Sequence, residues 1–547
     1  MRFIRFGFLL LLTCWARYNA CGQSGENYRS LLTQRVRSDK LPASDRIKAY
    51  VENGRIRLSL HDAIVLTLEN NSNIQIEETQ IESNKFSLLS TYQPFDPLLQ
   101  SSLSINRIST PTYSQLQGVG QATTEALNTL SQVGQISYTQ KFTTGTNVLA
   151  SISAAKYSTN SSFNFFNPYV NSGLNFQFTQ PLLRNFGRFP NTAQLTIARR
   201  ALTQSRSVFE AEVNDAILSV IGQYWVAVQA RGALDVQKRA LDLAEVSYMH
   251  DKRALELGAL PPLDISRSES EVASRRVQEI QADYVLAQAE EALRMTIGAD
   301  QDPQFQSLGF ELTENPQPTG DLENVNPEEV LAEALNNRPE VKSAKDALAM
   351  DETSIRYAQN QLKPDLILSG SYLSNGLGGN QYDLNTGRLI SPGGFGSSFS
   401  QLFSFGFPGY GGSLTLNFPV KNRGAQARLG NALVSRTRDQ YSNRQTQEQI
   451  TRQVRDAVNQ LNAAKLGLTA ANTSFDLSKK LLAADQRKFE LGAETNFFVL
   501  DSQERLAGAE LALLQAQVNY QIAVAAIRHA TSDLLTPYQL QLEAGSK

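Results

Sequence analysis

The sequence predicts a mainly α-helical protein with a smaller, membrane-type β part. Three observations support this fold class. Apolar residues recur every seven positions through two long segments, both segments end at the same Leu-Gly-Ala turn, and stretches of alternating apolar and polar residues interrupt the helical sequence. Sustained heptads are typical of long packed helices, and short alternating stretches are typical of strands between two environments. The chain of 547 residues therefore contains one helix-and-strand plan twice.

The N-terminal segment, residues 1–22, has the pattern of a secretory signal peptide. Basic residues precede the apolar run Phe6–Leu12, and the small residues Ala20 and Gly22 suit cleavage. A second interpretation is a lipoprotein signal in which Cys21 becomes acylated, because a small residue precedes that cysteine. Both interpretations export the protein from the cytoplasm, and the sequence leaves the lipidation of Cys21 open.

Two long helices are predicted from the internal repeat. In the second copy, bulky residues recur at Val454, Leu461, Leu468, Phe475, Leu482 and Phe489. A line of small residues accompanies them, and the first copy has the same two lines. A bulky line beside a small one lets neighbouring helices pack closely. The two segments, about 190–257 and 425–491, are too long for core helices of a compact domain.

Each long helix is expected to turn and to pack against shorter helices. The turns are Leu257-Gly258-Ala259 and Leu491-Gly492-Ala493. Glycine there supplies the left-handed conformation that ends a helix. A helix of roughly 68 residues spans about 100 Å, so two shorter helices stacked end to end are needed to cover it. The expected partners of the first long helix are 58–92 and the segment from the first turn to Ile297. Those of the second are 326–361 and 494–533.

Strands are predicted after the first short helix of each copy, over 98–183 and 365–420. Pro97 and Pro364 end those helices, and the residues that follow alternate between apolar and polar. Four core strands are expected in each chain, and a further hairpin at 135–155 either joins them or extends outside. Bacterial barrels need at least about eight strands, and open sheet edges cannot face lipid. Several chains must therefore pool their strands.

The composition argues against chemistry of the chain's own. It has 51 basic and 53 acidic residues and a net charge of −2, which gives no electrostatic reason to expect nucleic acid as a partner. Both cysteines, Cys14 and Cys21, lie near the N-terminus, and three histidines are scattered singly, so no metal site is expected. The sequence has no phosphate-binding loop or catalytic triad pattern. We therefore expect neither an enzyme nor a cofactor.

These features suggest an order of domains. A signal peptide (1–22) and an N-terminal extension (23–57) precede the first repeat, 58–300, with strands at 98–183 and a tip at 257–263. A linker (301–325) leads to the second repeat, 326–535, with strands at 365–420 and a tip at 491–497. Residues 536–547 form a C-terminal tail.

The combined pattern resembles the outer-membrane efflux proteins related to TolC, the exit ducts of tripartite pumps and type I secretion systems. The resemblance covers residues 58–535. It rests on the duplicated plan, both Leu-Gly tips, and the motifs Leu68-Glu69-Asn70-Asn71, Gln180-Pro181-Leu182-Leu183 and Leu335-Asn336-Asn337-Arg338-Pro339. It implies a homotrimer in outer-membrane lipid, with a twelve-stranded β-barrel that continues into a periplasmic α-barrel. It also implies that a periplasmic adaptor protein and an inner-membrane transporter dock at the two tips.

The same resemblance implies a gate at the periplasmic entrance. Asp501 and Asp264 occupy acidic tip positions of such ducts. The sequence also departs from the family pattern at three places. Phe489 replaces a gate tyrosine, Phe498 replaces a second acidic residue, and Glu494 replaces an arginine that would bridge to Asp264.

Loss of that bridging arginine predicts a rewired latch. Glu494 beside Asp264 would be repulsive, so another cation must hold the tips together. Arg267 lies three residues after Asp264 and on nearly the same helix face, from which it would pair with an acidic residue of the neighbouring hairpin. An exposed pair contributes only about 0–1 kcal/mol, so the latch is expected to be weak and reversible. Three copies of Asp501 around one axis would favour cations.

The function that the sequence favours is a passive export duct. The alternative is a trimeric coiled-coil surface or adhesive protein anchored by a β-barrel. Its heptads would form one terminal stalk, whereas this sequence has two helical hairpins with strands inserted between the helices. The sequence leaves the cargo open between drugs, metal ions and proteins, and it does not name the adaptor or the transporter.

Overall fold

The structure is a computed structural model that describes residues 47–538, except 53, 113, 115–116, 118–125, 259–261, 302, 319, 321 and 384–385. The described residues all belong to one compact unit, Arg46–Lys547, so the two predicted repeats share that unit. The predicted signal peptide with Cys21, the tip residue Ala259 and the side chain of Asp264 lie outside the described part of the chain.

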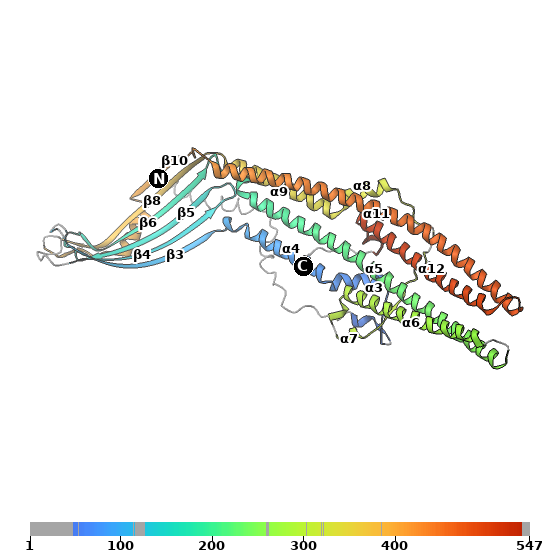
Figure 1. Ribbon diagram of the computed structural model, residues 1–547. Coiled ribbons are helices and arrows are strands. Elements are labelled where there is room, and N and C mark those ends of the chain that lie inside the picture. The colour runs from blue at the N-terminus through green and yellow to red at the C-terminus, as the bar shows by residue number, and fades with distance from the viewer. Residues whose placement is uncertain are drawn as a thin grey trace. The chain divides into compact units, whose positions relative to one another are not determined.

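Two long helical hairpins dominate the described residues (Figure 1). They are α5 (Arg188–Glu256) with α6 (Pro262–Thr296), and α11 (Arg423–Glu490) with α12 (Asn496–Thr531). The shorter helices are α3 (Leu60–Asn70), α4 (Ser72–Ser90), α8 (Pro327–Asn337) and α9 (Pro339–Gln361). α3, α4 and α6 pack on α5, and α8, α9 and α12 pack on α11; α9 and α12 also pack on α5. This arrangement confirms the prediction that shorter helices cover each long one.

Each short helix that was expected before the strands is divided into two. In the first repeat the division falls at Asn71, whose extended backbone ends α3 and whose side chain accepts hydrogen bonds from the N–H groups of Asn73 and Ile74 in α4. In the second repeat it falls at Arg338, because the residue before a proline resists the helical conformation. The expectation of continuous helices at 58–92 and 326–361 is therefore wrong at these two positions.

The helices enclose two apolar cores that follow the predicted heptad lines. The first core includes Ile64, Ile217, Val220, Tyr224 and Leu293. The second includes Ile450, Val454, Leu461 and Leu468, with Ala464 and Ala516 packed against it. Nearer the tip, Phe475, Leu482 and Phe489 continue the bulky line but are only half-buried in the single chain. No helix in the described part of the chain is both long enough and apolar enough to cross a membrane.

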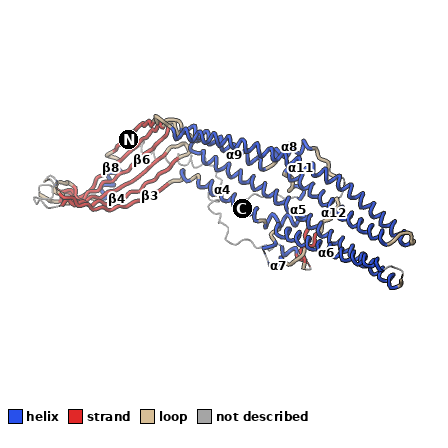
Figure 2. The backbone as a smooth tube through the Cα atoms, in the orientation of Figure 1, coloured by secondary structure: helices blue, strands red, loops and turns tan. Residues whose placement is uncertain are grey.

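Six long strands form one antiparallel sheet among the described residues. They are β3 (Leu98–Pro111), β4 (Ala126–Lys141), β5 (Asn147–Thr159), β6 (Phe166–Pro181), β8 (Asp365–Tyr382) and β10 (Pro408–Asn417). Their order is β10-β8-β6-β5-β4-β3, and the short strand β9 (Leu389–Ser391) pairs with β8. The hairpin predicted at 135–155 therefore joins the sheet between β3 and β6, and the expected four core strands become six. The strands run into the helices at one end of the sheet (Figure 2).

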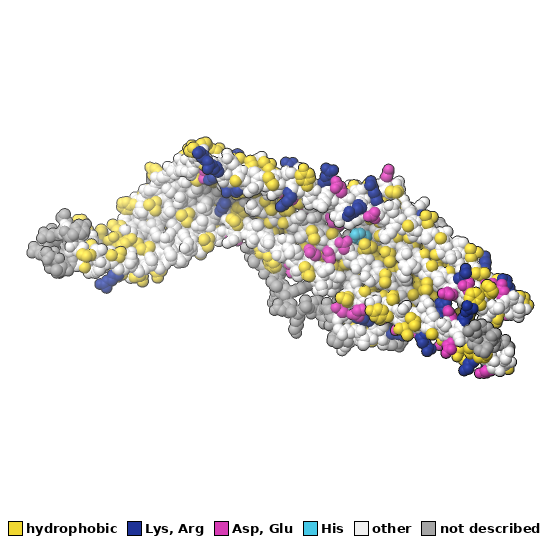
Figure 3. All heavy atoms as spheres, viewed as in Figure 1, with side chains coloured by type: hydrophobic (Ala, Val, Ile, Leu, Met, Phe, Trp, Pro, Cys, Tyr) yellow, Lys and Arg dark blue, Asp and Glu magenta, His cyan; other side chains and the backbone are white. Residues whose placement is uncertain are grey.

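The pairing register gives the sheet one apolar and one mostly polar face. The apolar face includes Leu99, Leu103, Ile105, Ile136, Ile152, Leu174, Phe176, Phe178, Leu368, Leu414 and Leu416. The opposite face includes Ser102, Ser104, Gln135, Ser137, Ser153, Asn175, Gln177, Thr179, Ser371 and Thr415. Most of the large apolar side chains in this set are exposed in the single chain. In Figure 3, charged side chains gather over the helices, and hydrophobic and uncharged ones prevail over the strands.

A small second sheet joins two segments that we predicted to be an N-terminal extension and a linker. β2 (Arg55–Leu58), from the predicted N-terminal extension, pairs with β1 (Val51–Glu52) and with β7 (Phe310–Leu312) from the predicted linker. Tyr224 of α5 holds this sheet to the helices, since its hydroxyl donates to the carbonyl of Leu58 and accepts from the N–H of Glu314, both at 3.2 Å. Burial raises the pKa of Tyr224 to about 12, so it stays a donor.

Candidate functional site at the hairpin tips

Both hairpins turn at a glycine that needs its special conformation. Gly258 and Gly492 have φ angles of 72° and 71°, a region that residues with a Cβ rarely adopt. The N–H of each glycine donates to a carbonyl of the preceding turn, Leu255 and Phe489 respectively, at 2.9 Å. A Cβ added at either glycine would meet no atom within 4 Å. The turns are therefore open, with space for a partner to approach the backbone.

A buried aspartate–serine pair braces each hairpin just behind its turn. Asp251 of α5 accepts a hydrogen bond from the Ser268 hydroxyl of α6, and Asp485 of α11 accepts one from Ser502 of α12. The two aspartates are only 5% and 7% exposed. A buried carboxylate is costly without partners, so each pair holds its two helices in one relative position.

The side chain of Asn496 links the two hairpins of the same chain near their turns. The Nδ2 of Asn496, the first residue of α12, donates to both carboxylate oxygens of Asp251 at 3.1 Å. Asp251 thus receives hydrogen bonds from its own hairpin and from the other one. Hydrogen bonds to a charged group are stronger than neutral ones, so this contact is a specific link between the tips.

One lysine pairs with two acidic groups of the second tip. The Nζ of Lys488 lies 2.7 Å from Glu494 and 3.5 Å from Asp485. The hydrogen bond from Ser502, followed by that from Lys488, holds the pKa of Asp485 below its usual range, and the hydrogen bond to Glu494 raises the pKa of Lys488. Glu494 therefore has a cation from its own tip, whereas we had expected the compensating cation to be Arg267 of the other hairpin.

Arg267 does meet the neighbouring hairpin, but through an aromatic ring. Its guanidinium carbon lies 4.8 Å from the ring centre of Phe497. Phe498 stands edge-on to Phe497 with ring centres 5.4 Å apart, and Phe489 stands edge-on to His250 of the first hairpin at 6.2 Å. The structure thus brings three of the predicted gate residues, Arg267, Phe489 and Phe498, into contacts between or beside the hairpins.

Asp501 lies apart from this cluster of contacts. Its carboxylate accepts a hydrogen bond at 2.8 Å from Arg505, one turn further along α12, and both side chains remain accessible. The acidic ring expected from three copies of Asp501 is therefore partly balanced by a cation in each chain. The side chain of Asp264 is outside the described part, so its contact with Glu494 stays a prediction.

The internal repeat could have predicted the two buried aspartate–serine pairs. The shift that places Leu257 on Leu491 also places Asp251 on Asp485 and Ser268 on Ser502. A carboxylate and a hydroxyl that recur together on both sides of a repeated turn indicate a contact across the hairpin. Lys488 and Asn496 have no counterpart in the first copy, so repetition gave no signal for them.

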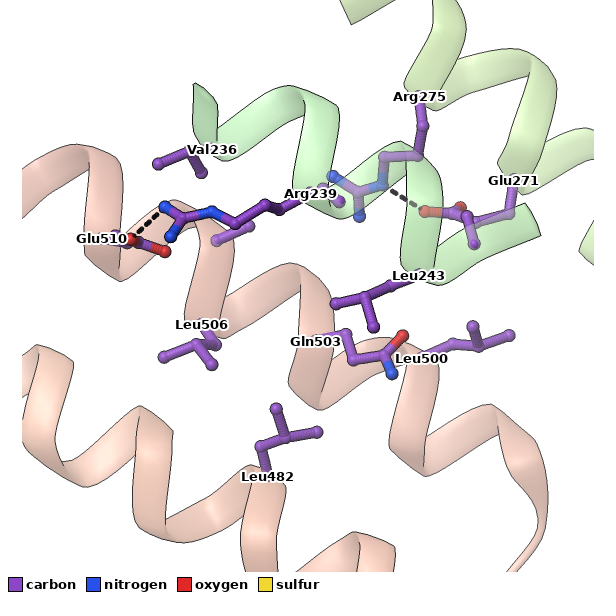
Figure 4. Close-up of a pocket in the computed structure, with 13 residues that line it drawn as sticks. Val236, Arg239, Leu243, Glu271, Arg275, Leu482, Leu500, Gln503, Leu506 and Glu510 are labelled. Carbon is purple, nitrogen blue, oxygen red and sulfur yellow. Dashed lines mark hydrogen bonds and ion pairs between the residues drawn. The ribbon is translucent and has the colours of Figure 1, made fainter. Parts of the chain in front are cut away.

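Above the tips, charged pairs line the seam between the hairpins. Figure 4 shows Arg239 of α5 pointing toward Glu510 of α12, and Arg275 pointing toward Glu271; both pairs are 2.6 Å apart. The cavity beside them measures about 70 Å³. This volume is below the roughly 300–1,000 Å³ of sites for small organic molecules. A second cavity of about 570 Å³, whose lining includes Arg239, Phe475 and Glu510, lies along the same seam. Among the described residues, no cluster of His, Cys, Asp or Glu could hold a metal ion.

Paired helical hairpins that continue into a two-faced antiparallel sheet define the fold class of outer-membrane channels. The solved structures with this fold include the outer-membrane channel OprN, at 16% identity and a TM-score of 0.60 over 87% of this chain and 90% of that one. They also include the CmeC channel of Campylobacter jejuni, at 15% identity and a TM-score of 0.59 over 92% of this chain and 90% of that one.

Sequence comparison identifies the family. Residues 135–299 and 330–532 match the family described as Outer membrane efflux protein, and the chain belongs to that family. Its location is accordingly the outer membrane, with a periplasmic extension. The chain is 21% identical over 299 residues to two Pseudomonas putida proteins, the probable efflux pump outer membrane protein TtgC and the antibiotic efflux pump outer membrane protein ArpC. Those matches cover 54% of this chain and 56% of each relative, so the chain spans about half the length of these relatives.

Proposed function

We propose that this chain is the exit channel of a tripartite efflux pump or a type I secretion system. It conducts its cargo passively from a periplasmic adaptor and an inner-membrane transporter to the exterior. The observation that carries this proposal is the two-faced sheet, whose polar face would line a path that continues between the helices. A passive channel needs no catalytic group, and the energy comes from the transporter. The comparisons do not support the alternative of an adhesive surface protein.

The sheet makes a specific form of the channel possible. Its two edge strands, β3 and β10, each pair with one strand only among the described residues, which leaves the outer edge of each unpaired, and unpaired edges cannot face lipid. In a homotrimer, β10 of one protomer would pair with β3 of the next and close a barrel. Three sheets of six long strands make eighteen, not the twelve implied by the family resemblance. Barrel diameter grows about linearly with strand number, and barrels of roughly 16–18 strands leave a water-filled channel.

The tips are the proposed entrance and docking site. Leu257 and Leu491 stand 79% and 72% exposed beside open glycine turns, which suits contact with the tip of an adaptor. The Asp251–Asn496 and Arg267–Phe497 contacts would hold the two hairpins of each protomer together when the entrance is closed. The pairing of Arg267 with a carboxylate of a neighbouring hairpin stays a prediction.

Planar-bilayer recording of the purified trimer tests the proposal. A duct of this kind gives a mostly closed, cation-preferring channel, whereas an adhesive protein gives no channel. Asp501→Asn should reduce the preference for cations, because it removes the accessible carboxylate and leaves Arg505 unbalanced. A trimer that inserts into the bilayer but never conducts would rule out the export function.

A further inference from the structure

A short helix lies on the apolar face of the sheet. α10 (Phe395–Ser404) follows β9 and packs against β8 and β6. It contacts β8 at Ser374, Gly376 and Gly378, positions that alternate onto the same face as Leu366, Leu368 and Tyr372. On β6 it meets Ser172, which is paired directly with Gly376. The helix therefore covers part of the apolar face and stands outside any path lined by the polar face.

The sheet is shaped to receive this helix. A Cβ at Gly376 would lie 2.1 Å from the carbonyl oxygen of Ser398, and one at Gly378 would lie 2.3 Å from that of Gly394. Two serines of the strands complete the fit. The Ser374 hydroxyl donates to the carbonyl of Leu402 at 2.8 Å, and the Ser172 hydroxyl lies 2.7 Å from that of Ser398. Polar groups on an otherwise apolar face are thus satisfied by the helix, which docks as a fixed part of the sheet.

The outward side of α10 and its flanking residues are aromatic. Phe395 and Phe403 are 47% and 55% exposed, and Phe399 stacks on Phe403 with ring centres 6.3 Å apart. Two further exposed rings lie close by in the sequence: Phe407, just before β10, and Tyr410, within it. No charged residue occurs between Leu389 and Val420. An exposed, uncharged segment that is rich in phenylalanine is unsuited to water and matches the aromatic girdles that flank the lipid-facing band of membrane barrels.

We propose that α10 is an external interfacial helix whose phenylalanines contact lipid acyl chains at the outer edge of the membrane. The proposal rests on the proposed function, because it takes the apolar face of the sheet as the lipid-facing one. Lipid is the occupant that fits, since the exposed rings are continuous with that face and carry no charge for a protein partner to recognise. The close packing of α10 explains why the strands beneath it have glycine and serine where neighbouring positions have leucine and phenylalanine.

Tryptophan fluorescence in vesicles of brominated phospholipid tests this contact in the full-length trimer. Phe403→Trp reports on α10, Phe176→Trp on the apolar face away from the helix, and Leu373→Trp on the opposite face of β8. The unmodified protein supplies the background: of its two tryptophans, Trp15 lies in the predicted signal peptide and Trp225 is buried in α5. We expect bromine to quench Phe403→Trp as strongly as Phe176→Trp and several times more than Leu373→Trp. Bromine near the headgroup end of the acyl chain should quench Phe403→Trp more than bromine near its methyl end.

A second pair of variants tests whether the position of α10 depends on the glycines beneath it. In the Phe403→Trp background, Gly376→Ala should displace α10 and reduce quenching by lipid, whereas Gly412→Ala on the same face should not, since its Cβ meets nothing closer than 3.8 Å. Quenching of Phe403→Trp by aqueous iodide instead of bromolipid would overturn the proposal for α10. Failure of Phe176→Trp to be quenched by bromolipid would instead overturn the lipid-facing sheet and with it the proposed channel.

Discussion

Removal of the Asn496 side chain should loosen the closed entrance. In the Asn496→Ala variant, Asp251 loses two hydrogen bonds at 3.1 Å from the other hairpin but keeps the one from Ser268. Both bonds join one amide nitrogen to one carboxylate, so we count them as a single contact, and a hydrogen bond to a charged group contributes about 1.5–3 kcal/mol. If the link exists only in the closed state, its loss shifts the balance between closed and open entrance by roughly 10- to 100-fold in each protomer, since about 1.4 kcal/mol corresponds to a factor of ten.

Single-channel recording measures this shift as open probability. Asn519→Ala is the matched control, because Asn519 is an exposed asparagine on the same helix and accepts a hydrogen bond only from Gln515 among the contacts described. We expect Asn496→Ala to spend far more time open than either the unmodified channel or Asn519→Ala. Equal open probability in all three proteins, with intact trimers, would refute the reasoning that Asn496 holds the tips together.

Three further predictions concern the tips and the helical packing. Gly258→Val and Gly492→Val should abolish export while trimers still assemble, because bulk at these open turns strains the backbone and blocks docking; normal export by both would remove the docking site. Ala464→Glu should cost several kcal/mol by burying an unpaired charge, seen as loss of SDS-resistant trimers, and unchanged assembly would contradict the packing. The lowered pKa of Asp485 means that its carboxylate stabilises the fold above the ordinary pKa of about 3.9 and that this contribution is lost as pH falls through the lowered value. Thermal stability should therefore drop more steeply below about pH 4 in the unmodified protein than in Asp485→Asn, and parallel curves would exclude this role.

The helical part of the fold was predictable because its signal is repeated many times. Val454, Leu461 and Leu468 are each weak indications, but their common spacing fixes the buried face, and the observed ends lie within two residues of those expected. The break at Asn71 was missed because an asparagine is tolerated inside helices and also caps them. Its side-chain hydrogen bonds decide between the two, and they depend on the geometry of the cap.

The sheet and the gate were predictable only in part. The first half of β4, from Ala126, is rich in small polar residues, so its alternation is weak, and only the later part was recognised as a strand. At the tips, the sequence identified the turns and the acidic positions. It did not show which side of each hairpin contacts the other, because contacts such as Arg267 with Phe497 depend on how the two hairpins are rotated against each other.

Disulfide trapping between the sheet edges tests the central claim of a shared barrel most directly. Leu103 on β3 and Leu414 on β10 both lie on the apolar face, so Leu103→Cys with a scan of cysteines along that face of β10 should find a register that links neighbouring protomers. Adjacent strands bring paired Cα atoms to about 4.5–5.5 Å, which a disulfide spans. The account predicts covalent trimers for such a pair and none for Leu103→Cys with Thr415→Cys, which lies on the opposite face. Only monomers throughout the scan would contradict the pooled eighteen-stranded sheet.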